Sequence, residues 1–149
     1  ATNSLLYSLS MGLFSYSSGP LAMGDLPVND KLYLLQHDVI KEIASNEPCV
    51  IVGRCADYIL KENAHTISVF IHANMEYRKK RAVVVHNIDE KKAETIINKT
   101  DKTRANYYSF YTGQKWGHTQ NYDLCIDSSK LSDDQIVDLI CAYIDIKNK

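Results

Sequence analysis

Helical and strand-like segments alternate along this 149-residue chain, and that alternation constrains the fold more than any other feature. Buried parallel strands read as short apolar runs rich in β-branched residues. Three such runs are present: PCVIVG (48–53), TISVFIHA (66–73) and YDLCIDSS (122–129). Since helical segments separate the runs, the order predicts an α/β fold with a parallel sheet and crossover helices. In such sheets ligands gather at the carboxyl ends of the strands.

The helical segments are recognised by their periodicity and their capping residues. Asn29 or Asp30 is expected to cap the first helix, in which apolar residues recur at helical spacing: Leu32, Leu35, Val39, Ile40 and Ile43. Asp89 and Ser132 are expected to cap two later helices. The five predicted helices therefore cover LYLLQHDVIKEIAS (32–45), ADYILKEN (56–63), NMEYRKKRAVVVHN (74–87), residues 90–111 and residues 132–146.

Length and composition indicate one domain over residues 1–149, with residues 1–28 as a mobile apolar N-terminal segment. This segment has no Lys or Arg, so it lacks the positive region of a signal peptide, and its Ser and Gly interrupt the run that a membrane helix needs. We therefore expect a cytoplasmic protein that does not bind or cross a membrane. The segment is expected mainly to pack in the core, with a homodimer as the alternative.

Charge and the spacing of cysteine and histidine argue against nucleic-acid binding and against a metal site. The formal net charge is -1, which gives no support for nucleic-acid binding. The four cysteines form no C-x-x-C, and the five histidines show no H-x-x-x-H spacing, so no metal site is expected. Cys55 is the one candidate for a reactive thiol because it follows an arginine.

The segment GR-x-A-D, residues 53–57, places an arginine at the end of an expected strand. Gly53 lets the backbone turn sharply, and the planar fork of Arg54 suits a phosphate or a carboxylate. Asp57 is expected to orient Arg54 or to accept a hydrogen bond from a ligand. A purely structural arginine is the alternative.

Two further segments carry arginines on helix faces. In EYRKKR (76–81), Arg78 and Arg81 are three residues apart and share a face, as do Asp101 and Arg104 in DKTRANYY (101–108). The alternatives are a solvated helix face for the first pair and a simple ion pair for the second. A loop with Lys115 and Trp116 follows, either as part of a site or as an aromatic anchor. Together, the three arginine-bearing segments point to a phosphate-bearing ligand.

In combination these motifs resemble the cytidylate kinase-like family of P-loop nucleoside monophosphate kinases. The resemblance is carried by VIVGR-x-AD, VFIHA-x-x-x-YR-x-x-R, D-x-x-R-A-x-YY and YDL-x-IDSS, and it runs from about Pro48 to Ile144. It implies a three-layer parallel sheet flanked by helices, with a lid-like helical region at about 87–121. It also implies transfer of the γ-phosphoryl group of ATP, with Mg²⁺, to a nucleoside monophosphate such as CMP or dCMP.

The resemblance also implies roles for individual residues. Arg54, Asp57 and Asp101 would bind the acceptor nucleotide, while Arg78 and Arg81 would lie near the donor nucleotide. Arg104 and Arg81 would act on the phosphates during transfer, and no metal ligand is implied in the chain itself. The partners that the resemblance implies are small-molecule nucleotides.

The chain departs from the family pattern in three places. Cys55 stands where an Asp often follows the GR arginine, and Ile97 stands at a lid arginine, with Lys99 as a stand-in. The segment GPLAMGD (19–25) has Asp where a P-loop has Lys, so we treat it as a chance match. The P-loop and its strand are therefore expected before residue 1. The alternatives to a kinase are a nucleotide-binding module without catalysis and a structural, dimer-forming role.

Overall fold

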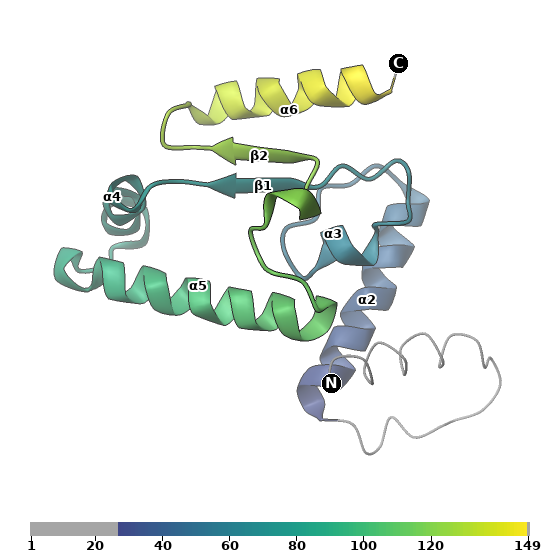
Figure 1. Ribbon diagram of the computed structural model, residues 1–149, viewed down its shortest axis with the longest axis horizontal. Coiled ribbons are helices and arrows are strands. Elements are labelled where there is room, and N and C mark those ends of the chain that lie inside the picture. Colours follow the sequence, from purple (N-terminus) through teal and green to yellow (C-terminus); the bar gives the residue numbers. More distant parts are fainter. Residues whose placement is uncertain (1–26, 149) are drawn as a thin grey trace. The chain divides into compact units, whose positions relative to one another are not determined.

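The computed structural model describes residues 27–148. Expectations for the N-terminal segment and for GPLAMGD therefore lie outside the described residues, apart from Pro27 and Val28. The described elements, in chain order, are α2 (Val28–Asn46), α3 (Ala56–Ile59), β1 (Val69–His72), α4 (Met75–His86), α5 (Glu90–Thr112), the 3-10 helix η1 (Thr119–Asn121), β2 (Leu124–Asp127) and α6 (Asp133–Lys147) (Figure 1). No helix in this part of the chain is long and apolar enough to cross a membrane.

Two compact units make up the described structure. The first unit comprises residues 27–66 and Tyr107–Lys115, and the second unit comprises Ile67–Asn106 and the chain from Trp116 to its C-terminal end. The single helix α5 therefore contributes its last turns to the first unit and the rest of its length to the second.

The second unit contains a two-stranded parallel sheet, which confirms an α/β fold with a small parallel sheet. β1 and β2 pair in register from Val69 opposite Leu124 to His72 opposite Asp127 (Figure 1). The helices α4 and α5 pack together through Ala82, Ala93 and Ile97, which are 6%, 0% and 8% exposed. The small side chains of the two alanines allow the helix backbones to approach closely.

The predicted strand PCVIVG, residues 48–53, is wrong for this structure: no strand forms there. A strand exists only where its backbone groups pair with a neighbour, and apolar composition cannot supply that neighbour. Ile51 packs against the core cluster of the first unit, whose members are Ile40, Ala56 and Ile59, whereas Val50 and Val52 are 94% and 88% exposed.

Helix α2 forms where predicted but differs in its cap and its buried face. Its N-cap is Pro27, without a side-chain hydrogen bond, because the Asp30 carboxylate accepts instead from the Tyr111 phenol at 3.1 Å. Tyr33 stacks on the Tyr111 ring at 4.0 Å. Of the five apolar residues expected on one face, Ile40 alone is buried; the others, Leu32, Leu35, Val39 and Ile43, are exposed. The face turned toward α5 is therefore largely polar and aromatic.

The later helices also begin at side-chain caps. Asp89 accepts from the backbone of Lys91 before α5, as expected, and Asn74, which was not expected as a cap, accepts from the backbone of Tyr77 at the start of α4. Ser132 and Gln135 form a reciprocal capping box at the start of α6. These caps fix where the helices of the second unit begin.

Candidate functional site

In the first unit, the GR-x-A-D segment forms a turn with an uncommon backbone. Gly53, Arg54 and Cys55 all have positive φ angles, 72°, 57° and 57°, and the Ala56 N–H donates to the Gly53 carbonyl at 3.1 Å. Glycine adopts this conformation freely, but each non-glycine residue held there costs roughly 1–3 kcal/mol. The turn leads directly into α3, with the Arg54 side chain exposed.

Cys55 does not have the environment of a reactive thiol. Its side chain is buried, at 3% exposure. Burial and, to a smaller extent, the nearby Asp57 carboxylate raise the pKa of the thiol to about 12, although the Arg54 guanidinium lowers it in part. A thiol with so little thiolate at neutral pH is a poor nucleophile. Cys55 therefore acts as a small apolar residue under the turn.

Two tyrosines of α5 lie near the side chains of this turn. The Tyr108 phenol donates to the Asp57 carboxylate at 2.7 Å, and Tyr108 is 5% exposed. Burial raises the pKa of the Tyr107 phenol, and the positive charge of Arg54 lowers it only in part. Sequence reasoning missed these partners. The available signal was the paired tyrosines in RANYY.

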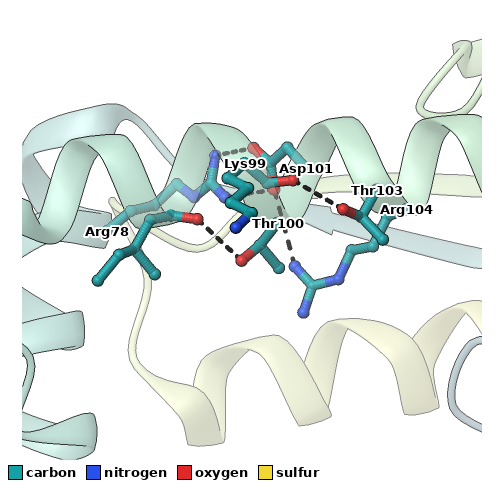
Figure 2. A network of polar contacts seen from close by, with 7 residues as sticks. Arg78, Lys99, Thr100, Asp101, Thr103 and Arg104 are labelled. Carbon is teal, nitrogen blue, oxygen red and sulfur yellow. Dashed lines mark hydrogen bonds and ion pairs between the residues drawn. The ribbon is translucent and has the colours of Figure 1, made fainter.

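In the second unit, Arg78 and Asp101 form a two-pronged ion pair between α4 and α5 (Figure 2). Nη1 and Nη2 of Arg78 each donate to one oxygen of Asp101 at 2.7 Å. The side chains are 29% and 25% exposed, so the pair is only partly solvated. A planar guanidinium that meets both carboxylate oxygens holds the carboxylate in a defined orientation.

Arg104 lies at the edge of the same network. Its Nη1 is 3.7 Å from Oδ1 of Asp101, and its side chain is 59% exposed (Figure 2). Asp101 thus holds Arg78 firmly and Arg104 loosely. The positive charge of Arg104 is accessible to an anionic ligand, whereas that of Arg78 is already engaged by a carboxylate.

The remaining candidates of the second unit stand outside this network. Arg81 is exposed on α4. Ile97 is buried in the core cluster between α4 and α5, so its position contributes to packing. Lys99 is exposed, and its carbonyl accepts from the Thr103 hydroxyl at 3.0 Å (Figure 2). The structure therefore brings together Arg78, Asp101 and Arg104 in the second unit, and places Arg54 and Asp57 in the first.

The loop with Trp116 is an aromatic anchor. The ring of Trp116 packs edge-on against the ring of Phe70 in β1, with 5.5 Å between the ring centroids. The ring of Tyr122 stacks on the same Phe70 ring, with 4.9 Å between the centroids. Gly117 has a φ of +73°, and a Cβ atom there would come within 3.0 Å of the Phe70 ring. These contacts support the second of the two interpretations of this loop, in which it is an aromatic anchor and not part of a site.

At the carboxyl ends of the two strands, Asp127 takes part in a compact polar turn. The Ser129 hydroxyl and backbone N–H both donate to its carboxylate, and these bonds lower the pKa of Asp127. His72 lies opposite in register, and its carbonyl accepts from Ser128. Between residues 27 and 148, no group of three or more His, Cys, Asp or Glu side chains is arranged to hold a metal ion.

The model of the cytidylate kinase-like family matches residues 1–130. A crystal structure of an uncharacterized protein from Eubacterium ventriosum is similar, with 38% sequence identity and a TM-score of 0.74. The similarity covers 79% of this chain and 74% of that chain. A search of curated proteins gave no match.

Proposed function

This chain belongs to the cytidylate kinase-like family, and from that premise we propose that it is a nucleotide kinase. The reaction is transfer of the γ-phosphoryl group of ATP to a nucleoside monophosphate, with CMP or dCMP as the first acceptors to test. An oxygen of the acceptor phosphate attacks the γ-phosphorus, and the bond from that phosphorus to the β-phosphate oxygen breaks. ADP leaves with the electron pair, and no covalent enzyme intermediate is needed.

The observation that carries the proposal is the network of Arg78, Asp101 and Arg104. Phosphoryl transfer depends mainly on positioning and on neutralising the charge of the phosphates. Arg104 offers an exposed guanidinium, at 59% exposure, whose neighbouring carboxylate is already held by Arg78. We propose that Arg104 and Arg81 contact the phosphates during transfer and that Asp101 contacts the acceptor sugar. Mg²⁺ is part of the substrate and arrives bound to ATP.

The other binding roles follow the same logic. Arg54 and Asp57 are proposed to bind the acceptor nucleotide, and Arg78 and Arg81 to lie near the donor. Because Arg78 is engaged by both oxygens of Asp101, we give it the additional role of orienting that carboxylate. Residues 87–121 are proposed to act as a lid over the phosphates within one kinase-like domain. A cytoplasmic location and a homodimer remain predictions.

The test combines binding and turnover. Titration of the protein with CMP, dCMP, UMP, AMP and GMP measures acceptor affinity, and release of ADP from ATP–Mg²⁺ measures transfer. Arg104→Met is expected to weaken acceptor binding about tenfold, the effect of losing one hydrogen bond to a charged group. Lys102→Met, which removes another exposed cation of the same helix, serves as the matched control and is expected to bind like the parent.

Each outcome has a distinct meaning. If the parent binds none of the monophosphates, the proposed function is wrong. Binding without ADP release selects the second candidate, a nucleotide-binding module without catalysis. If Arg104→Met and Lys102→Met bind equally well, Arg104 is a surface ion-pair residue and not a ligand.

A further inference from the structure

The carboxylate of Asp57 is held at one of its two oxygens by the C-terminal end of α5. The phenol of Tyr108 donates to Oδ2 of Asp57 at 2.7 Å, and Tyr108 is 5% exposed. Both residues belong to the first unit. Asp57 itself is half-buried, so part of its side chain remains accessible to a ligand. A carboxylate with one oxygen fixed in this way presents the other oxygen in a defined direction.

The proton of the Tyr108 phenol has two acceptors within reach, and Asp57 is the stronger one. Oε1 of Gln114 lies 3.1 Å from the phenol oxygen, compared with 2.7 Å for Oδ2 of Asp57. A phenol carries one proton, which an ionised carboxylate attracts more strongly than a neutral amide does. The shorter distance agrees with this order. The proton is therefore directed mainly to Asp57.

Hydrogen bonds within the end of α5 fix the support of this phenol. The Thr112 hydroxyl donates to the Tyr108 carbonyl at 2.6 Å, and the Gln114 backbone N–H donates to the Thr112 hydroxyl oxygen at 3.0 Å. Thr112 is 9% exposed. The N–H of Gly113 donates to the Ser109 carbonyl at 2.9 Å. Since hydrogen bonds shielded from water are strengthened, Tyr108 is anchored independently of its contact with Asp57.

The second oxygen of Asp57 determines which ligand group this site can accept. Within residues 27–148, the one hydrogen bond to the Asp57 carboxylate is that of Tyr108 to Oδ2. An ionised carboxylate accepts hydrogen bonds and donates none, so Oδ1 selects a ligand group that donates. The oxygens of a phosphate are themselves acceptors and carry the same sign of charge. In a nucleoside monophosphate, the donors are the hydroxyls of the sugar and the amino group of the base.

We propose that Oδ1 of Asp57 binds a hydrogen-bond donor of the acceptor nucleotide, and that Tyr108 is the positioning residue that orients it. The choice of ligand rests on the proposed function. The orientation of the carboxylate rests on the contacts of Tyr108. If Tyr108 only supported the packing of the first unit, its loss would weaken all ligands alike, whereas a positioning role affects only ligands that carry the donor.

Selectivity among three nucleotides separates these two roles. UMP has a carbonyl oxygen where CMP has its base amino group, and the dideoxy analogue of CMP lacks both sugar hydroxyls. Calorimetric titration gives the dissociation constants of all three for the parent, for Tyr108→Phe and for Tyr111→Phe. The last is the matched control, because it removes a phenol of the same helix that donates to a different carboxylate, that of Asp30, at 3.1 Å.

We expect the parent to bind CMP about tenfold more tightly than the analogue that lacks the donor bound by Asp57, the effect of one hydrogen bond to a charged group. A weaker UMP identifies the amino group as that donor, and a weaker dideoxy analogue identifies a sugar hydroxyl. In Tyr108→Phe the carboxylate is free to turn, so this preference is expected to fall to about threefold or less. Tyr111→Phe is expected to keep the preference of the parent.

Two further variants test the same contact with the Tyr108 ring intact. In Gln114→Glu a second carboxylate competes for the single phenol proton, so the preference is expected to fall as in Tyr108→Phe. Asp57→Asn removes the charge of the acceptor and is expected to abolish the preference. Unfolding midpoints from circular dichroism show whether each variant is folded, and Gln114→Glu decides the question if Tyr108→Phe is not.

Equal losses of affinity for all three nucleotides in Tyr108→Phe would overturn the inference, because they indicate a structural role. An unchanged preference in the deciding variant, the same fall in Tyr111→Phe, or a parent that binds CMP and both analogues equally would also overturn it. In each of these cases CMP still binds, and the proposed function stands. A parent that binds none of the three nucleotides would overturn the proposed function and this inference together.

Discussion

The ion pair of Arg78 and Asp101 provides the sharpest energetic test of the site. Its two hydrogen bonds, both 2.7 Å, join residues of α4 and α5, and the side chains are 29% and 25% exposed. We expect a coupling energy of about 2 kcal/mol, above the roughly 0.2–1 kcal/mol of exposed pairs and below the loss of about 3–5 kcal/mol when a buried pair is broken. The variants are Arg78→Gln, Asp101→Asn and the double variant.

The magnitude follows from opposing contributions. Two unit charges about 4 Å apart attract by about 4 kcal/mol at the effective dielectric constant of a protein surface. Ordering the arginine side chain and removing water from both groups offset about half of this attraction. Arg78→Gln leaves Asp101 with only its loose contact to Arg104 at 3.7 Å, and Asp101→Asn leaves Arg78 without its counter-charge. We therefore expect each single variant to cost about 2–3 kcal/mol of stability.

Urea unfolding followed by circular dichroism gives the free energies for this double-mutant cycle. The control cycle uses Lys79 and Glu76, whose side chains approach to 3.1 Å on α4 with 76% exposure at the glutamate. We expect a coupling of no more than about 0.5 kcal/mol there. A coupling energy for Arg78 and Asp101 no larger than that of the control pair would refute the reasoning, because the ion pair would then behave as a solvent-exposed contact.

Two further predictions concern the glycines of the loop that follows α5, Gly113 and Gly117, and the carboxylate of Asp123. Gly117→Ala is expected to cost about 2 kcal/mol in urea unfolding and Gly113→Ala about 1 kcal/mol, because both glycines have positive φ but an added Cβ meets the ring of Phe70 only at the first; equal losses would contradict this. For Asp123, burial raises the carboxyl pKa, but hydrogen bonds from Ser68 outweigh it and hold the pKa below its ordinary value of 3.8. A lowered folded-state pKa contributes stability that is present above the ordinary pKa and is lost as pH falls through the folded-state pKa. Asp123→Asn should therefore cost about 0.5–1 kcal/mol at pH 7, and the stabilities of parent and variant should approach each other as pH falls well below 3.8. A difference that does not shrink with falling pH would contradict the assignment.

The features that the sequence predicts well are those decided within a few residues. The caps at Ser132 and Asp89 and the i, i+3 pair of Asp101 and Arg104 all form between near neighbours in the chain. Helical geometry alone brings such residues together. Their positions could therefore be read directly from spacing.

The features that the sequence does not predict depend on distant partners. Arg78 meets Asp101 from 23 positions away, and Tyr108 meets Asp57 from 51. The interhelical packing that sets these contacts has no periodic signature of its own. The same holds for PCVIVG, residues 48–53, because its apolar composition satisfies a strand but supplies no neighbour for pairing.

The turn at Arg54 unites the energetic and the functional arguments. Two successive non-glycine residues with φ of 57° are unfavourable, and such a backbone persists only where the surroundings over-determine it. Here Cys55 is buried beneath the turn, and Asp57 is bound by Tyr108. The apolar and polar contacts thus offset the strain while the side chain of Arg54 remains exposed. A turn held in this way for packing alone would gain nothing from the arginine, whereas a turn that presents a guanidinium to an anion requires the charge at that position and the rigidity beneath it.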